Sequence, residues 1–315
     1  MTVNRRVGVG ISSLSSNEGN ATLPRPASST HCELSSVEIG LLGSGSRPTT
    51  SSGQPGFELR LVSMPVKVTV LGTSGAWPSH GRACSGYLIE SAQAKLVLDL
   101  GFGTLPRLLA SCKAQEVSAV FISHAHADHC VDLYGLYRAL RLPTPPFQSP
   151  PIFAAPEVMD RVGALDGEGG ADRVRQELDF HQVGPDQSLS VGDLRLRTFA
   201  LPHFTPNLGV RVETDESVIA YTGDTGPTET VSDLARGADL FICDATYQEP
   251  PKEEGPRFLL TATEAGRYAR EAKAKRLMLT HFWPENDRMV SRDLAAAQFA
   301  GELILAEEGM ALTLE

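Results

Sequence analysis

Residues 119–129 read Ala-Val-Phe-Ile-Ser-His-Ala-His-Ala-Asp-His, an apolar stretch that runs directly into three histidines and one aspartate. The apolar residues predict a buried strand, and the polar residues that follow predict a turn and the start of a helix. Imidazole nitrogens and carboxylate oxygens are both good ligands for Zn²⁺. In an extended turn His124 and His126 point to the same side, whereas Asp128 and His129 begin the next helix. The spacing therefore predicts two adjacent metal sites rather than one.

Three further candidate ligands each follow an apolar stretch elsewhere in the chain. They are His203 after residues 198–202, Asp224 after residues 218–223 and His281 after residues 277–280. Rigidly held ligands are expected at the ends of strands, so the shared context strengthens the prediction of a metal centre. His31, His80 and His181 lack this context, and we expect them to be ordinary surface or core residues.

The composition limits the classes of partner. The chain of 315 residues has a formal net charge of −10 and a pI near 5.3, so it lacks the overall positive field that attracts nucleic acid or an anionic membrane. Its five cysteines form no Cys-x-x-Cys pair, which is typical of a reducing, cytoplasmic setting. No stretch approaches the ~20 apolar residues that a membrane-spanning helix needs, so no membrane partner is expected.

The chain divides into two parts by composition. Residues 1–63 are rich in Ser, Thr, Gly and Pro and are predicted to be a disordered, low-complexity tail. Met64 and Pro65 precede a strand-like stretch, 66–71, so Met64 is a candidate natural start and the tail a candidate for not belonging to the natural protein. A genuine flexible tail is the alternative. Residues 64–315 are predicted to form one folded domain.

The domain alternates between the two kinds of periodicity. Strands are also predicted over 85–90, 95–99, 119–122, 151–154, 194–201, 209–213, 218–221, 240–243, 276–279 and 302–305. Helices are predicted over 103–111, 128–140, 228–235, 263–274 and 291–299. This order favours layered sheets flanked by helices, an α/β class.

The run His-x-His-x-Asp-His, followed by Leu-Pro-His, Tyr-Thr-Gly-Asp-Thr and Leu-Thr-His, resembles the metallo-β-lactamase superfamily over residues 64–315. The resemblance implies a four-layer αββα sandwich of two mixed sheets flanked by helices. It also implies a first site of His124, His126 and His203, a second site of Asp128, His129 and His281, and a bridging Asp224. Two Zn²⁺ ions are expected, although such ligands also suit Mn²⁺ or Fe.

Shorter motifs resemble the branch that contains ribonuclease Z and cyclic-nucleotide phosphodiesterases. They lie at 70–75, 99–101, 221–225, 243–247 and 263–266. Two features depart from ribonuclease Z: residues 142–193 form only a modest connection without a basic cluster, and residues 257–261 lack the histidine of that enzyme. The resemblance also makes a homodimer plausible.

The leading hypothesis is a metal-dependent hydrolase that uses a hydroxide held by two metals, acting as a phosphodiesterase on a small nucleotide, cyclic nucleotides included. Asp128 is predicted to orient the proton of the nucleophile, and Asp244 to orient a metal-bound histidine, unless it is simply a turn carboxylate. Phe204 and Trp283 are candidate pocket walls, and Phe282 is expected in the core.

The sequence leaves four alternatives to a phosphodiesterase that acts on a small nucleotide. One is a tRNA 3′-processing endonuclease like ribonuclease Z, although the acidic balance disfavours RNA. A thioester hydrolase is the second and a lactone hydrolase the third, since the same nucleophile can attack an acyl carbon. A non-enzymatic metal-binding module is the fourth, and the complete ligand set argues against it.

Overall fold

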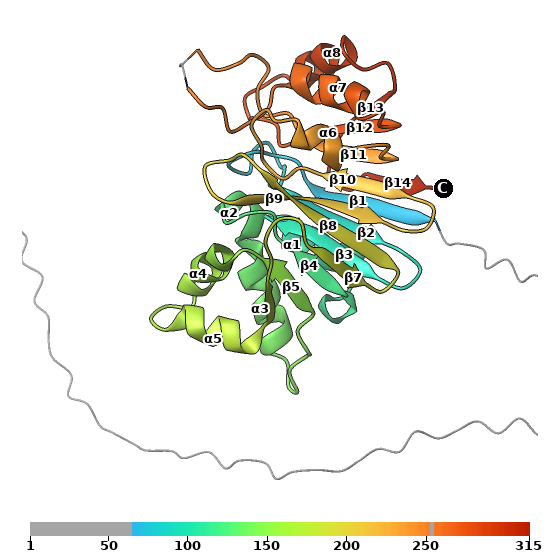
Figure 1. Cartoon of the computed structure of the whole chain (residues 1–315). Coiled ribbons are helices and arrows are strands. Elements are labelled where there is room, and N and C mark those ends of the chain that lie inside the picture. Colours follow the sequence, from blue (N-terminus) through green and yellow to red (C-terminus); the bar gives the residue numbers. More distant parts are fainter. Residues whose placement is uncertain (1–64, 253–254) are drawn as a thin grey trace, which may run out of the picture. The chain divides into compact units, whose positions relative to one another are not determined.

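The computed structural model describes residues 65–252 and 255–315. The predictions for the tail, 1–63, and for the start at Met64 therefore lie outside the described residues. The described chain forms two seven-stranded sheets that face each other (Figure 1). Their strand orders are β14-β1-β2-β3-β4-β5-β6 and β13-β12-β11-β10-β9-β8-β7.

The first sheet contains β1 (Val66–Gly72), β2 (Gly86–Glu90), β3 (Lys95–Leu100), β4 (Ala119–Phe121), β5 (Pro151–Ala154), β6 (Asp179–Gln182) and β14 (Ala311–Leu314). The second contains β7 (Ser188–Val191), β8 (Leu194–Leu201), β9 (Asn207–Glu213), β10 (Val218–Tyr221), β11 (Leu240–Asp244), β12 (Arg276–Thr280) and β13 (Glu302–Leu305). Both sheets mix parallel and antiparallel pairs, as predicted.

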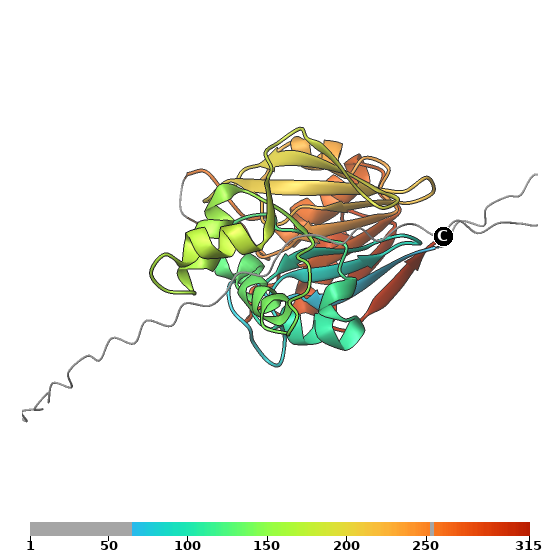
Figure 2. The same cartoon turned by 90° about the horizontal axis from the view of Figure 1, so that it is seen from below.

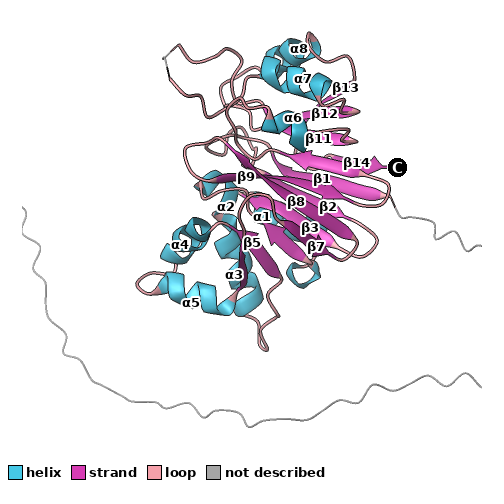
Figure 3. Ribbon diagram, in the orientation of Figure 1, coloured by secondary structure: helices cyan, strands magenta, loops and turns pink. Residues whose placement is uncertain are grey.

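Helices cover the outer faces of both sheets. The first sheet carries α1 (Thr104–Ser111), a 3₁₀ turn (Ala114–Glu116), α2 (Ala127–Cys130), α3 (Asp132–Arg141), α4 (Pro156–Ala164) and α5 (Gly170–Glu177). The second carries α6 (Thr230–Leu234), α7 (Ala262–Glu271) and α8 (Arg288–Ala296). Figures 2 and 3 show the two helical layers on opposite sides of the paired sheets, which confirms the predicted four-layer αββα sandwich.

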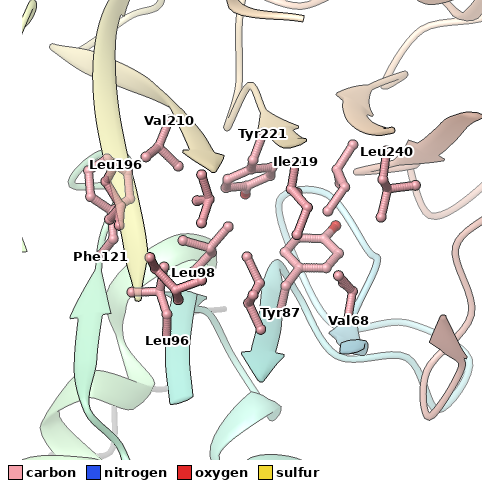
Figure 4. Packing of buried hydrophobic residues seen from close by; sticks show 14 of the residues in the cluster. Val68, Tyr87, Leu96, Leu98, Phe121, Leu196, Val210, Ile219, Tyr221 and Leu240 are labelled. Carbon is pink, nitrogen blue, oxygen red and sulfur yellow. The ribbon is translucent and has the colours of Figure 1, made fainter. Parts of the chain in front are cut away.

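Three apolar layers hold these elements together, and strand alternation sorts the side chains among them. Leu96 and Leu98 of β3 pack between the sheets, whereas Val97 packs against the helices. Successive side chains of a strand point to opposite faces, so one apolar run serves two layers. Figure 4 shows Tyr87 and Tyr221 within the inter-sheet layer, each buried to about the same extent as its aliphatic neighbours. Burying each such side chain contributes roughly 1.5–3 kcal/mol.

Local signals explain several boundaries. Helix α7 begins at a capping box, in which the Thr261 hydroxyl accepts from the Glu264 amide and the Glu264 carboxylate accepts from the Thr261 amide. The predicted helix 128–140 is instead split into α2 and α3, because the Tyr134 amide donates to the Val131 carbonyl in an i to i+3 turn. No helix among the described residues is long and apolar enough to span a membrane.

Candidate metal centre

The seven predicted ligands come together where strands of both sheets end. From the first sheet, the loop after β4 carries His124 and His126, and α2 carries Asp128 and His129. From the second sheet, His203 follows β8, Asp224 follows β10, and His281 follows β12. They form two groups that share Asp224. We call His124, His126 and His203 the first group, and Asp128, His129 and His281 the second group.

The imidazoles of the first group aim ring nitrogens at a common point. Nδ1 of His126 lies 3.0 Å from Nε2 of His124 and 3.0 Å from Nε2 of His203. Tetrahedral coordination at Zn–N distances of about 2.0–2.1 Å places neighbouring ligand nitrogens roughly 3.3 Å apart. The three nitrogens are therefore spaced as a small divalent cation requires.

The second group combines a carboxylate with two imidazoles. Oδ2 of Asp128 lies 3.3 Å from Nε2 of His281 and 3.7 Å from Nε2 of His129. The same oxygen accepts a hydrogen bond from the Ala76 amide at 2.8 Å, which fixes its direction. All three side chains are buried.

Asp224 presents one carboxylate oxygen to each group. Its Oδ2 lies 3.6 Å from Nε2 of His203 and 3.9 Å from Nε2 of His124. Its Oδ1 lies 3.2 Å from Nε2 of both His129 and His281. Oδ1 of Asp224 and Nε2 of His129 are buried without a hydrogen-bond partner, which is costly unless another group satisfies them. The donor set thus fits two divalent metal ions.

Four of the five histidines use their other ring nitrogen in a contact outside the groups. The partners of Nδ1 are the Ser123 hydroxyl for His124 at 3.0 Å, Asp99 for His129 at 2.7 Å, the Phe258 carbonyl for His203 at 2.8 Å and the Thr246 hydroxyl for His281 at 2.7 Å. Such contacts fix the ring orientation and the tautomer of a metal ligand. The pattern is that of imidazoles prepared to coordinate through Nε2.

Asp99 belongs to this outer layer, and the sequence analysis assigned it no role. Its buried carboxylate accepts from the Ser123 amide at 2.7 Å, the Ser123 hydroxyl at 2.8 Å and the Tyr221 hydroxyl at 2.6 Å, besides its contact with His129. The available signal was Asp-Leu-Gly at the end of a strand. Gly101 is required there because a Cβ atom would lie 1.9 Å from the Asp128 carbonyl oxygen.

Asp244 lies behind His281 rather than facing the metal ligands. Its Oδ1 accepts from the Thr246 amide at 2.8 Å and lies 3.7 Å from Nδ1 of His281. Its Oδ2 accepts from the Leu260 amide at 3.1 Å. The residue is therefore a buried turn carboxylate that also reaches His281 through the Thr246 hydroxyl.

The loop that carries Asp224 depends on its glycine. Gly223 has φ 59°, and a Cβ atom there would lie 2.7 Å from the Asn207 side-chain oxygen. The Asn207 side chain donates to the carbonyls of Asp224 at 2.5 Å and Thr222 at 3.1 Å. A side chain at position 223 would strain the backbone and displace the clamp that holds Asp224.

The protein's own charges treat the two groups differently. Burial, together with the neighbouring His129 and His203, holds the pKa of His124 well below its usual range. Burial opposes protonation of His281 as well, but Asp224, Asp128 and Asp244 raise the pKa of His281 to about 10. Burial and the neighbouring imidazoles thus favour the neutral form of His124, whereas the carboxylates around His281 favour its charged form.

The aromatic candidates and the other three histidines lie outside the two ligand groups or outside the described residues. Phe282 is buried in the layer beneath α7, as expected. Trp283 lines a cavity of about 520 Å³, and Phe204 is largely exposed beside His203. His181 is exposed and contacts Asp179, and His80 lies outside both ligand groups, while His31 is outside the described residues.

Comparisons with known proteins agree with this geometry. Residues 95–282 match the Beta-lactamase superfamily domain. An uncharacterised protein of Mycobacterium tuberculosis is 34% identical over 244 residues, covering 75% of this chain and 88% of that protein. Ribonuclease Z of Haloarcula marismortui is 30% identical over 307 residues, covering 78% of this chain and 96% of that enzyme.

A solved structure extends the likeness to the fold. The metallo-beta-lactamase fold protein YhfI of Bacillus subtilis superimposes with a TM-score of 0.69 at 27% identity, covering 79% of this chain and 100% of that chain. The predicted membership rests on the ligand motifs, and the family match, the relatives and the sandwich all agree with it. The chain therefore belongs to the metallo-β-lactamase superfamily of hydrolases.

Proposed function

We propose that this protein is a phosphodiesterase for a small nucleotide, cyclic nucleotides included, that works with two divalent metal ions. Zn²⁺ is the first candidate, and Mn²⁺ or Fe are the alternatives. The first group with Asp224 would hold one ion, and the second group with Asp224 the other. The observation that carries the proposal is the Asp224 carboxylate, whose two oxygens face different ligand groups.

Two bound cations would supply Lewis acidity, a nucleophile from water near neutral pH, and neutralisation of the charge on a phosphate. The chain itself positions the reactants. Burial opposes ionisation of Asp128, but His129 and His281 hold the pKa of its carboxyl well below the usual range. The ionised Asp128 carboxylate can therefore accept a hydrogen bond from the attacking water. Asp99 and Thr246 fix the rings of His129 and His281. Asp244 acts as a positioning residue through Thr246.

A ribonuclease Z-like endonuclease is the second candidate, favoured by the relative in Haloarcula marismortui that carries this name. Two observations weigh against it. The net charge is −10, and the connection 142–193 folds into β5, α4, α5, β6 and β7 rather than a basic arm. RNA binding depends on Lys and Arg contacts to phosphates, so a small diester is the better proposal.

A substrate panel on fully metallated protein tests the proposal. The panel contains bis(p-nitrophenyl) phosphate, cyclic AMP, a precursor tRNA, a thioester and a lactone, and the variant is Asp128→Ala. Asp160→Ala is the matched control, because this exposed carboxylate on α4 pairs with Arg175 outside both ligand groups. We expect cleavage of a small diester that Asp128→Ala loses and Asp160→Ala keeps. Cleavage restricted to precursor tRNA or to acyl substrates would overturn it, as would no cleavage at all.

A further inference from the structure

Both tryptophans of the chain lie beside the second group. Trp77 directly follows Ala76, whose amide donates to Oδ2 of Asp128. Trp283 follows His281 by two residues. The two indole rings meet edge to face, with centroids 4.9 Å apart and planes at 84°. Both tryptophans are therefore held next to the second group by the chain segments that contact or carry its residues.

A cavity adjoins the pair and leads away from the second group. It measures about 520 Å³, and its lining includes Trp283, Ser74, Arg82, Asn286 and Arg288. Ser74 bridges to Phe282, the residue after His281, so the cavity begins next to a proposed ligand. Its volume falls within the range of about 300–1,000 Å³ that is typical of small-molecule sites.

The chemistry of the lining favours a planar, uncharged ligand that accepts hydrogen bonds. The indole of Trp283 lines the cavity and supplies an aromatic ring for stacking, while Trp77, 39% exposed, packs against Trp283 from outside the lining. Arg82 and Arg288 offer donors, and Nε of Arg288 is buried without a partner. Glu285, Asp287 and Glu307 also line the cavity, and Glu308 lies 3.7 Å from Arg82, so the two arginines give the cavity no net positive charge that would favour an anion. A nucleobase meets these conditions, because it stacks and carries acceptor atoms without charge.

We propose that the Trp77–Trp283 pair and the adjoining cavity form the subsite for the nucleobase of the substrate. The inference rests on the proposed function, since it names the group that lies beyond the scissile phosphate. Stacking on indole is tolerant of base identity, because every base has a π face. The subsite therefore gives nucleotides a higher binding affinity than diesters that lack a base.

Tryptophan fluorescence of the metallated, full-length protein reads this subsite directly, because the chain contains no other tryptophan. The probes are adenosine, AMP and ribose 5-phosphate. We expect saturable changes in emission with adenosine and AMP, and none with ribose 5-phosphate. An equal response to ribose 5-phosphate, or no response to adenosine up to millimolar concentration, would overturn the subsite.

Variants locate the base. We expect Trp283→Leu to weaken adenosine binding about tenfold, with Trp77 still reporting, and Trp283→Phe to restore most of the affinity. Phe147→Leu is the matched control, because Phe147 is 40% exposed but lines a separate hollow with Glu177. A larger loss in Phe204→Leu would place the base against Phe204 and Phe258, whose rings lie 4.6 Å apart, and would overturn the assignment.

The assay separates this inference from the proposed function. Adenosine contains no phosphodiester, so its binding does not depend on turnover. Cleavage of small diesters without adenosine binding would remove the subsite and leave the phosphodiesterase in place. Adenosine binding without cleavage of any diester would remove the phosphodiesterase and leave a nucleoside site.

Discussion

The two ligand groups lie side by side yet are supported in different ways. The first group is partly open, since His126 is half-buried, and its rings contact neutral partners, the Ser123 hydroxyl and the Phe258 carbonyl. The second group is buried, and carboxylates stand behind it, Asp99 directly and Asp244 through Thr246. The difference teaches that one centre can combine a partly exposed set of ligands with a buried set that carboxylates support from behind.

Removing the residue that both groups share has the largest expected effect. In Asp224→Ala, both groups lose a carboxylate, so we expect metal content to fall from two ions to below one per chain. Activity should fall on the order of 10³-fold, because metal stabilisation of the transition state is worth several kcal/mol. Elemental analysis measures the metal content, and the rate of diester hydrolysis measures the activity. Asp233→Ala, an exposed carboxylate on α6, serves as the control. Two retained ions would contradict a shared ligand.

A change confined to the support of the second group sharpens the comparison. Asp99→Asn keeps the shape but removes the charge behind His129, so we expect the affinity for one of the two ions to fall about 10- to 100-fold. Competition with a metal indicator measures both affinities. Asp239→Asn is the control, because Asp239 is also buried but binds the Val218 amide away from the centre. An equal loss at both metal positions would show that the groups are not independently supported.

The order in which a chelator removes the metal ions from the unaltered protein tests the same contrast. More negative surroundings hold a dication more strongly, so a chelator should remove the ion of the first group at roughly tenfold lower concentration. The ion that the chelator removes last should still bind in His126→Ala, which alters the first group. It should be absent in His281→Ala, which alters the second group. If the half-buried group keeps its ion longer, charge does not set the order.

The smallest effect concerns the loop behind His203. Burial opposes ionisation of Glu264, but hydrogen bonds from Arg257 and Thr261 lower its pKa. A lowered folded-state pKa means that the stabilisation is complete above the unfolded value of about 4.3 and is lost as pH falls through the folded value. We expect Glu264→Gln to cost about 1 kcal/mol at pH 7 and less below pH 4.

Urea unfolding between pH 7 and pH 3.5 measures this dependence. Glu271→Gln is the control on the same helix, because its pair with Arg267 is exposed. A cost that does not change with pH would mean that the ion pair of Glu264 with Arg257 is not its source.

The sequence predicted most of the sandwich and singled out the seven candidate ligands that the fold brings together, because both signals are local. His124 and His126 follow β4, His203, Asp224 and His281 each follow a strand of the second sheet, and the strands 151–154, 194–201, 218–221 and 302–305 have the predicted bounds. Strands β6, β7 and β14 were not predicted, because they are short and most of their residues are exposed or half-buried. The short helices α4 and α5 were read as part of a connection. Whether the seven residues bind metal, and whether the protein forms a homodimer, stay predictions.

The role of Asp99 could not be predicted, for a physical reason. Its partners Ser123, His129 and Tyr221 lie between 24 and 122 positions away in the chain. Only the pairing of β3 with β4, and the packing of the two sheets, brings these residues together. A carboxylate that acts through long-range contacts leaves no periodic signal in the sequence.

The passage of the chain from one sheet to the other has a further consequence. The first crossing lies between β6 and β7, after His124, His126, Asp128 and His129 but before His203, Asp224 and His281, and the chain returns to the first sheet only at β14. A cut in this connection would leave each fragment with an incomplete set for both groups. Reassembly of the two fragments would then depend on added metal, and the centre would serve as a sensor of whether two separately produced halves have found each other.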